Sequence, residues 1–340
     1  MAVDNRIGIG LIGCGRAGLI HGRNFAANIP GAQLVALSDA NESVLADASR
    51  ELRVDKASSD YASLLRDNAV DAVVVVTPTV LHEEIVVAAA NAGKHVFCEK
   101  PMAMSVREAE TMNAAVKANR VKLQIGFMRR FDREFAGAKQ KVDEGKIGEV
   151  TLIKTLTHGP STPQEWMYDI NKSNGPLAEV NSHDIDTVRW FAESEVEEVY
   201  AVAGNFRCRD VADKYPDFYD NVVLATKLAD GKQAMVEGAV AVGYGYDARL
   251  EILGTEGLLQ AGRVEANTIR TVTKVGGVQF GSVPSWRNLF HEAYFKEDQA
   301  FVDAILNDDE PIVTGLDGQM AVAVVVAGNE SIRKGKPVRL

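Results

Sequence analysis

The chain has 340 residues, 46% of them hydrophobic and 25% charged, with a formal net charge of −10. This length exceeds what one hydrophobic core usually supports, so we expect a globular protein of two domains. The acidic balance without any lysine- or arginine-rich block argues against nucleic acid as a partner, and no apolar run approaches the length of a membrane span. The three cysteines are widely spaced and the N-terminus lacks signal-peptide features, so we expect a cytoplasmic protein without disulfides and without a bound metal.

The first third of the sequence alternates between apolar runs and helical patterns. The apolar runs lie at 6–13, 33–39, 69–78 and 94–101, and helical segments are predicted at 15–28, 41–52, 60–68 and 81–93. Continuously apolar strands that alternate with helices are typical of a parallel sheet covered on both faces. The pattern predicts an α/β domain with a doubly wound sheet over residues 1–126.

After residue 126 the remaining strand candidates alternate between apolar and polar residues. They lie at 149–157, 196–204, 221–240 and 248–262, and turn signals such as ADGK and GTEG join them. This pattern indicates an antiparallel sheet, and helices predicted at 176–192, 290–307 and 317–333 would cover one of its faces. We therefore expect a second domain of the α+β class over residues 127–340.

The predicted sheet of the second domain carries more apolar residues than one helical layer needs to cover. Examples are Val222, Leu224, Met235 and Val236. An apolar sheet face in excess of the helices favours association with a second copy. We expect a homo-oligomer, either a dimer or a tetramer.

A glycine-rich motif, GCGRAG, follows the first apolar run and opens the first predicted helix. Gly13 permits a tight turn, Gly15 lets the backbone approach a pyrophosphate, and Gly18 allows close packing of the helix. Arg16 and Ala17 complete the predicted cofactor loop, and the helix N-terminus would favour the phosphate charge. A glycine-rich turn that binds no nucleotide is the alternative.

Asp39 stands at the end of the second apolar run. A carboxylate at this position bonds the ribose hydroxyls and repels a 2′-phosphate. Ala40 and Asn41, which follow it, offer no positive charge to a 2′-phosphate. The predicted cofactor is therefore NAD.

Two further strand ends carry polar residues that would face the nicotinamide half of the cofactor. The segment VVVVTPTVLH provides Thr77, Pro78 and His82, and the segment CEKP provides Glu99 and Lys100. Ligands of open α/β sheets lie outside the carboxyl ends of the strands. Lys100 could bond a substrate hydroxyl and stabilise the alkoxide that develops during hydride loss, although a surface lysine at a strand end is the alternative.

The run EVNSHDID sets an imidazole among carboxylates within a predicted helix. Glu179, His183, Asp186 and Trp190 fall on one helical face, and apolar residues fill the opposite one. This polar face is either a catalytic surface or ordinary solvated surface.

The sequence resembles the oxidoreductase family of glucose-fructose oxidoreductase, inositol dehydrogenase and the rhizopine-catabolism protein, Gfo/Idh/MocA. The motifs GCGRAG, TPTVLH, CEKP, GFMRRFD, GPLAEVNSHDID, GYDARLEILGTEG and AYFKEDQAF carry the resemblance, in this order. GFMRRFD and GYDARLE look most like inositol 2-dehydrogenases. The resemblance implies a Rossmann domain, a second domain with an open, mostly antiparallel sheet that often forms oligomer contacts, and a catalytic lysine, aspartate and histidine.

Carried over to this chain, the resemblance makes Lys100 and His183 catalytic, with Asp186 as a supporting acid. Glu179 occupies the position of the family aspartate, and the added methylene shifts the carboxylate enough to change which substrate hydroxyl it holds. GPSTPQEW also replaces an Arg-Asp-Pro segment of many relatives. The resemblance further implies a substrate pocket, although each member could serve packing alone: Met128, Arg129, His158, Trp286 and Tyr294.

The sequence is thus interpreted as an NAD-dependent dehydrogenase acting on a secondary alcohol of a cyclic polyol, similar to inositol 2-dehydrogenases. A reductase or dehydrogenase of another sugar, anhydrosugar or sugar acid is the first alternative. A non-enzymatic NAD-binding sensor is the second, and the presence of both Lys100 and His183 argues against it.

Overall fold

The computed structural model describes residues 6–27 and 29–340, which form two compact units. Unit 1 contains the described residues up to Met128 together with Glu292–Gln319, and unit 2 contains Arg129–His291 and Met320–Leu340. The change of unit after Met128 lies two residues from the predicted boundary. The return of Glu292–Gln319 to unit 1 was not predicted, because helical periodicity does not tell which sheet a helix covers.

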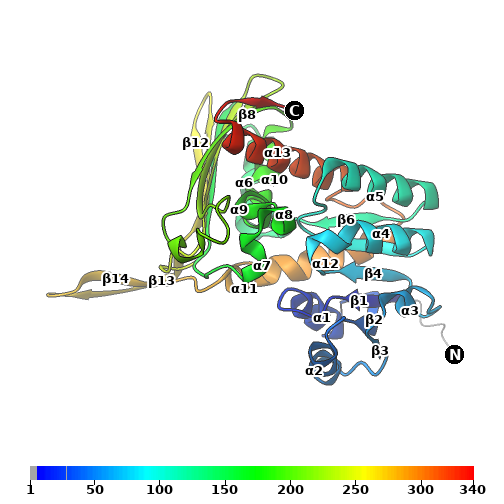
Figure 1. The fold of residues 1–340 in the computed structure, drawn as a ribbon. Coiled ribbons are helices and arrows are strands. Elements are labelled where there is room, and N and C mark those ends of the chain that lie inside the picture. The colour runs from blue at the N-terminus through cyan, green and yellow to red at the C-terminus, as the bar shows by residue number, and fades with distance from the viewer. Residues whose placement is uncertain (1–5, 28) are drawn as a thin grey trace. The chain divides into compact units, whose positions relative to one another are not determined.

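Unit 1 is built on a parallel sheet with the strand order β3-β2-β1-β4-β5-β6 (Figure 1). This order is that of the doubly wound dinucleotide-binding fold, so the predicted α/β class is confirmed. The β-branched run of β4 is buried throughout, as expected for a strand with helices on both faces. The strands are β1 (Ile7–Ile12), β2 (Ala32–Ser38), β3 (Ala57–Ser58), β4 (Ala72–Val75), β5 (His95–Glu99) and β6 (Leu123–Gly126).

Four helices of unit 1 follow the strands as the sequence pattern predicts, whereas the helix at 106–119 was not predicted. Polar side chains begin three of these helices: Asn41 accepts the backbone N–H groups of Ser43 and Val44, Asp60 accepts that of Ala62, and Ser105 accepts that of Glu108. Residue 28, the last of the first predicted helix, lies outside the described residues. The elements are α1 (Gly18–Ala26), α2 (Glu42–Leu52), α3 (Tyr61–Leu65), the 3-10 turn η1 (Thr79–Leu81), α4 (His82–Asn91), α5 (Val106–Asn119) and α12 (His291–Leu306).

Helix α12 completes the core of unit 1, although it stands late in the sequence. Phe301 and Val302 are fully buried and pack with Phe97 of β5 and Leu11 of β1. The ring of Phe301 meets the ring of Phe97 edge to face at 5.9 Å. The sequence between Met128 and α12 is therefore an insertion into unit 1 by chain order.

Unit 2 contains a seven-stranded sheet with the order β12-β11-β7-β10-β9-β8-β15. Strands β7 and β10 pair in parallel and the other pairs are antiparallel, which confirms the predicted mostly antiparallel sheet. Strand β9 alternates strictly between buried and partly or fully exposed residues. The strands are β7 (Val150–His158), β8 (Val196–Gly204), β9 (Asn221–Leu228), β10 (Gln233–Ala239), β11 (Asp247–Gly254), β12 (Leu258–Arg263) and β15 (Val338–Arg339).

Helices of unit 2 cover one face of this sheet (Figure 1). The predicted single helix over 176–192 is wrong in one respect, because α9 ends at Glu179 and α10 begins at Ser182. The side-chain amide of Asn181 lies in this break and donates to Asp184 and to the Glu237 carbonyl of β10. The helical elements are η2 (Met128–Phe131), α6 (Arg133–Asp143), α7 (Glu165–Tyr168), α8 (Ile170–Ser173), α9 (Gly175–Glu179), α10 (Ser182–Ala192), η3 (Arg209–Val211), α11 (Trp286–Leu289) and α13 (Gly315–Lys334), whose first turn belongs to unit 1.

The apolar residues predicted to be in excess on this sheet are mostly covered. Val222, Leu224 and Val236 are at most 1% exposed, so the expectation that they form an open surface is wrong. Their strand neighbours point the other way, and Val202 and Val223 stand opposite each other in the β8–β9 register with 58% and 42% exposure. The open apolar surface of the sheet is this second face.

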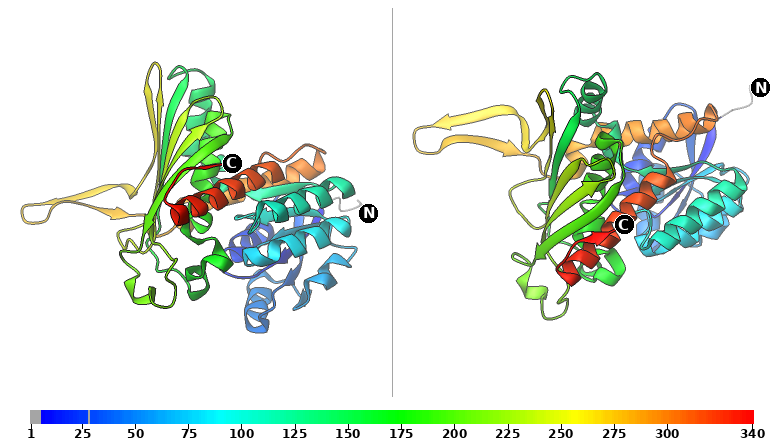
Figure 2. Two further views of the ribbon diagram at one scale, coloured as in Figure 1. Left: turned by 45° about the horizontal axis from the view of Figure 1, so that its top comes forward. Right: turned by 90° about the horizontal axis from the view of Figure 1, so that it is seen from above.

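A two-stranded ribbon, β13 (Glu265–Thr273) and β14 (Gly277–Ser282), leaves the sheet of unit 2 and extends away from it (Figure 2). No strand was predicted from the sequence over residues 265–282. Among the residues that the structure describes, no helix combines the length and the apolar character needed to cross a membrane.

Candidate functional site

Four neighbouring strands of unit 1 end beside residues that the sequence predicts to bind the cofactor or substrate. Because β2, β1, β4 and β5 are adjacent and parallel, their carboxyl ends share one edge of the sheet. Gly13 follows β1, Asp39 follows β2, and Lys100 follows β5, while Thr77 stands just beyond the end of β4. The structure therefore brings these four predicted residues to one edge.

The loop between β1 and α1 has the backbone geometry of a dinucleotide-binding turn. Gly13 has a φ of +96°, and a Cβ on it would lie 2.5 Å from the carbonyl oxygen of Val76. A Cβ on Gly18 would lie 1.9 Å from the Gly13 carbonyl oxygen, whereas a Cβ on the exposed Gly15 would meet no described atom within 4 Å. Open space beside a helix N-terminus fits a pyrophosphate.

Asp39 is tied to this loop by both of its carboxylate oxygens. One accepts the backbone N–H of Cys14 at 2.7 Å, and the other accepts that of Asn41 at 2.9 Å. Burial and then the charge of Asp39 raise the pKa of the Cys14 thiol to about 12, so Cys14 packs as a neutral group. Arg16 is exposed and Ala17 is partly exposed in the same loop, and their contact with a cofactor stays a prediction.

His82 braces the neighbouring strand ends rather than presenting a free ring. Its two ring nitrogens each lie 2.9 Å from a backbone carbonyl oxygen, one of Thr77 and one of Pro101. Burial lowers the pKa of the ring, which favours the neutral form. Among the described residues the buried hydroxyl of Thr77 has no hydrogen-bond partner, and Pro78 is exposed, so this loop retains polar capacity for a ligand.

Glu99 and Lys100 differ in exposure although they are neighbours. Glu99 is 5% exposed and lies inside unit 1, whereas Lys100 is half-buried at the edge of the sheet. One oxygen of Glu99 accepts the backbone N–H of Lys100 at 2.9 Å. The buried carboxylate of Glu99 therefore holds the backbone of Lys100 in place.

The EVNSHDID segment of unit 2 is not solvated surface. Every residue of 181–189 is buried, and His183 in the first turn of α10 is 5% exposed. Glu179, at the end of α9, is partly exposed. The alternative of a solvent-facing polar helix is wrong for this segment.

The sequence did not single out Asp184, a buried carboxylate of unit 2 that accepts four hydrogen bonds. Asp184 is fully buried, and its Oδ1 accepts from Arg129 at 2.7 Å and from Thr155 at 2.6 Å. Its Oδ2 accepts from Thr157 at 2.7 Å and from Asn181 at 2.9 Å. Four donors from η2, β7 and the α9–α10 break thus fix the start of α10.

Arg129, which was predicted to contact substrate, is buried in unit 2 and bonds to neighbouring side chains there. Its guanidinium donates to Asp184 and to the Thr157 hydroxyl, and it lies over the rings of Phe135 and Phe290. Burial opposes its charge, but the charge of Asp184 raises the pKa of the guanidinium above its ordinary value. The structure favours a supporting role for Arg129.

Asp186 also supports its neighbours, as the sequence interpretation expected. Its two oxygens accept from Nε of Arg130 at 2.9 Å and from Nη2 at 2.6 Å, a bidentate pair. The same guanidinium lies 5.8 Å from the ring centroid of Trp190. The pair ties η2 to α10 near His183.

His158 lies on a different face of β7 from the contacts of α10. Thr155 and Thr157 point to Asp184, and alternation turns His158 toward Glu237 of β10 at 2.9 Å and Tyr244 at 2.5 Å. Its role in substrate binding stays a prediction.

The other predicted substrate contacts divide between the units. Met128 is buried at the end of the first stretch of unit 1, and Tyr294 is buried on α12 of unit 1. Trp286 is partly buried in α11 of unit 2.

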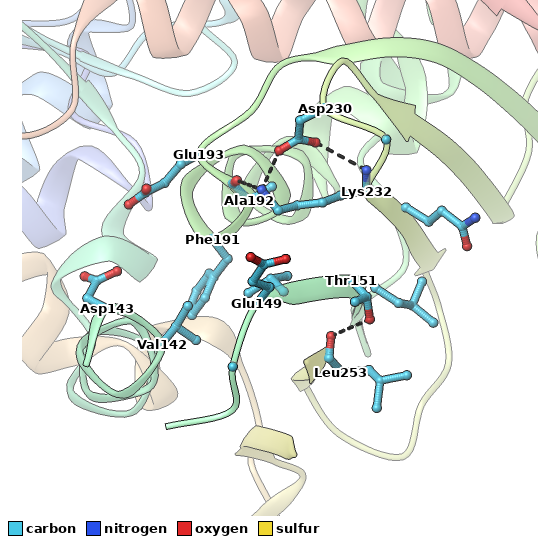
Figure 3. Close-up of a pocket in the computed structure, with 15 residues that line it drawn as sticks. Val142, Asp143, Glu149, Thr151, Phe191, Ala192, Glu193, Asp230, Lys232 and Leu253 are labelled. Carbon is cyan, nitrogen blue, oxygen red and sulfur yellow. Dashed lines mark hydrogen bonds and ion pairs between the residues drawn. The ribbon is translucent and has the colours of Figure 1, made fainter. Parts of the chain in front are cut away.

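A separate depression of about 1080 Å³ lies at the other end of α10 (Figure 3). Phe191, Glu149, Asp230 and Lys232 are among its lining residues, and the Lys232 amine donates to the Ala192 carbonyl at 2.9 Å. Since a helix rises 1.5 Å per residue, this depression begins roughly 12 Å along α10 from His183. It is not the predicted site.

A doubly wound sheet with a glycine turn, a ribose-type carboxylate and a lysine at one edge defines the class of NAD-binding oxidoreductases. The chain belongs to the Gfo/Idh/MocA oxidoreductase family. Residues 7–127 match the family's NAD-binding Rossmann fold, and residues 139–340 match its C-terminal alpha/beta domain. The chain is therefore an NAD-dependent dehydrogenase, and the sensor alternative loses its support.

Relatives match the chain along nearly its whole length. It is 33% identical over 338 residues to scyllo-inositol 2-dehydrogenase (NAD(+)) of Bacillus subtilis, covering 99% of this chain and 97% of the relative. It is also 33% identical to Myo-inositol 2-dehydrogenase of Thermotoga maritima, covering 98% of each. The crystal structure of scyllo-inositol dehydrogenase from Lactobacillus casei with bound NAD(H) and scyllo-inositol aligns with a TM-score of 0.90 at 31% identity, covering 98% of this chain and 99% of that one.

The position of Asp39 predicts the choice of cofactor. We expect NAD to be preferred over NADP by well over tenfold in kcat/KM, because a 2′-phosphate would meet a carboxylate. Asp39→Ser combined with Ala40→Arg should reduce or reverse this preference. Asp39→Asn is the control, since it removes the charge but keeps an oxygen for the Cys14 amide. Equal use of both cofactors by the wild type would contradict the assignment.

The saturation of Asp184 predicts a large effect on stability. Asp184→Asn should lower the free energy of unfolding by about 3–5 kcal/mol, because it leaves the buried guanidinium of Arg129 without its counter-charge. Denaturant unfolding measures this loss. Asp143→Asn is the matched control, because Asp143 pairs with Lys139 but is 52% exposed, and it should cost about 1 kcal/mol or less. A similar small loss for Asp184→Asn would refute the role given to this carboxylate.

Proposed function

We propose that the protein oxidises a secondary hydroxyl of inositol or a related cyclic polyol with NAD as the hydride acceptor. The observation that carries the proposal is Lys100, which stands at the edge of the parallel sheet beside the glycine turn and Asp39. The inositol dehydrogenases that match the chain over nearly its full length support the substrate class.

In this proposal the proton and the charge are handled by three side chains. His183 takes the hydroxyl proton as general base, and Lys100 bonds the same oxygen and stabilises its developing negative charge. Glu179 bonds a neighbouring hydroxyl and orients the ring. The nicotinamide of bound NAD supplies the site that accepts the hydride. The buried position of His183 supports this role, since a base shielded from water acts on the bound hydroxyl alone.

Glu179 keeps one alternative substrate class in view. The family aspartate is a glutamate here, at the partly exposed end of α9, and its longer side chain moves the carboxylate. A different sugar, anhydrosugar or sugar acid is therefore the second candidate. NADH formation measured across inositols, sugars and sugar acids decides between the two.

The catalytic assignment predicts the effects of three variants. His183→Ala should lower kcat by roughly 10²- to 10⁴-fold, while NADH affinity and melting temperature stay near wild type. Lys100→Ala should cost a similar factor, and the double variant should lose far less than the product because both residues act on one oxygen. Glu179→Gln should raise KM for the polyol more than it lowers kcat. Retention of a third of kcat by His183→Ala would end the assignment of this residue as the base.

We further propose a cytoplasmic homo-oligomer, a dimer or a tetramer, that associates through the open face of the unit 2 sheet. Tyr200, Val202 and Val223 support this surface, because they are large apolar residues exposed on adjacent strands. The three cysteines are free and buried, in keeping with a reducing compartment.

Light scattering at micromolar concentration tests the association. We expect a mass at least twice that of the chain, and Val202→Lys with Val223→Lys should shift it toward the monomer, because two buried ammonium groups would disrupt an apolar contact. Leu316→Lys is the control, since Leu316 is 57% exposed on α13 and outside this face. A monomeric wild type would refute the proposal.

A further inference from the structure

A histidine that the predicted reaction does not use is buried between two carboxylates in unit 1. His21 of α1 is fully buried, and its Nδ1 lies 2.6 Å from Oδ1 of Asp298 on α12. Its Nε2 lies 3.2 Å from Oε1 of Glu99 at the end of β5. One ring thus connects the helix after the glycine turn, the strand before Lys100 and helix α12, which follows the first segment of unit 2 in the sequence.

Both ring nitrogens of His21 face anionic acceptors, so both carry protons. A neutral imidazole has only one N–H and would direct a lone pair at one of the carboxylates. Burial opposes the charge, but Asp298 and then Glu99 outweigh it and raise the pKa of His21 well above its ordinary value. The ring also packs against Phe97 and meets Tyr294 edge to face, and Asn24 donates to the second oxygen of Asp298 at 2.7 Å.

Glu99 passes this constraint on to the lysine. While Oε1 of Glu99 meets His21, Oε2 accepts the backbone N–H of Lys100 at 2.9 Å. The carboxylate also lies against Gly126 of β6, where a Cβ would come within 2.9 Å of its Cδ. A carboxylate clamped on both oxygens and packed on bare backbone has one position, and so has the amide of Lys100.

We propose that His21 is a positioning residue, a buried imidazolium that holds Glu99 and through it sets the backbone from which Lys100 reaches the substrate hydroxyl. The proposal rests on the catalytic role proposed for Lys100. His21 also links the predicted pyrophosphate site to Lys100, because α1, which carries His21, begins at the glycine turn that would bind the pyrophosphate. A misplacement of about an ångström costs up to roughly 10²-fold in rate, so this constraint belongs to catalysis as well as to folding.

Asn24 provides an internal control for a role in stability alone. It bonds the same Asp298 from the same helix, and among the described residues its side chain donates to Asp298 and not to Glu99. Asn24→Ala therefore weakens the buried cluster without releasing Lys100. His21→Gln keeps one amide donor, so it offers a variant that folds even where His21→Ala does not.

The first experiment compares kinetics and stability. We expect His21→Gln to lower kcat by roughly 10- to 100-fold with NADH affinity within about threefold of wild type. Asn24→Ala should lower the melting temperature by about as much as His21→Gln does, but it should keep kcat within about twofold of wild type. The proposal is overturned if His21→Gln keeps more than half of the wild-type kcat, or if Asn24→Ala loses as much.

The second experiment tests the route through Glu99. In a double-mutant cycle, His21→Gln should lower kcat no further in a Glu99→Gln background, because Glu99 is the link to Lys100. Multiplicative losses would show that His21 acts by another route and would refute the proposal.

The third experiment needs no substrate. Nitrogen-15 spectra of lysine-labelled protein should show the Lys100 amide, assigned by its absence in Lys100→Arg, moving in His21→Gln and staying in place in Asn24→Ala. Labelled histidine should show both His21 nitrogens protonated at neutral pH. If wild-type protein oxidises no polyol, the proposed function fails and these spectra still decide the positioning role. An unmoved Lys100 amide in His21→Gln overturns that role whatever the activity.

Discussion

A buried carboxylate with every acceptor site matched is the constraint on which the site of unit 2 depends. Asp184 collects donors from η2, β7 and the break before α10, and removing any of them would leave charge or polarity in a dry interior. The geometry it imposes is local and stiff: α10 must begin where the carboxylate meets the two threonines. His183 directly precedes Asp184, so its backbone is held in place by the same contacts. The hydrogen bonds of Asp184 therefore fix the position of His183, the predicted base, although α10 is only 11 residues long.

The same arrangement recurs in unit 1 with different partners. Glu99 is buried, bonded on both oxygens, and directly precedes Lys100, just as Asp184 directly follows His183. In each unit the residue predicted to meet the substrate lies beside a buried carboxylate that accepts hydrogen bonds from several elements of that unit. A buried carboxylate accepts hydrogen bonds from several elements at once, so it locates the backbone more firmly than an apolar neighbour would.

The residues that the sequence predicted well are those whose position follows from chain order. Gly13, Asp39 and Lys100 each follow a parallel strand, and parallel strands end at one edge whatever the details of packing. The break between α9 and α10 was missed because helical periodicity continues across it, whereas the Asn181 side chain in the break bonds to β10, a partner that lies far away in the sequence. Asp184 was missed for a related reason. Its partner Arg129 is 55 residues away, and a face analysis of one helix contains no information about a partner from another element.

The long separation of Arg129 and Asp184 in the sequence also explains why Arg129 was predicted to contact substrate and no role was predicted for Asp184. An arginine in a family motif suggests ligand contact, whereas the guanidinium of Arg129 is buried, pairs with Asp184 and lies over two phenylalanine rings, which favours a supporting role. Its neighbour Arg130 is held by Asp186 through a bidentate pair, so both arginines of the motif serve the placement of α10. Glu179 differs from all of these residues. It stands at a helix end, before the break and partly exposed, where an added methylene alters reach without disturbing a saturated network. A substitution at that position changes what the site can hold while the supporting carboxylates keep the rest of it in place.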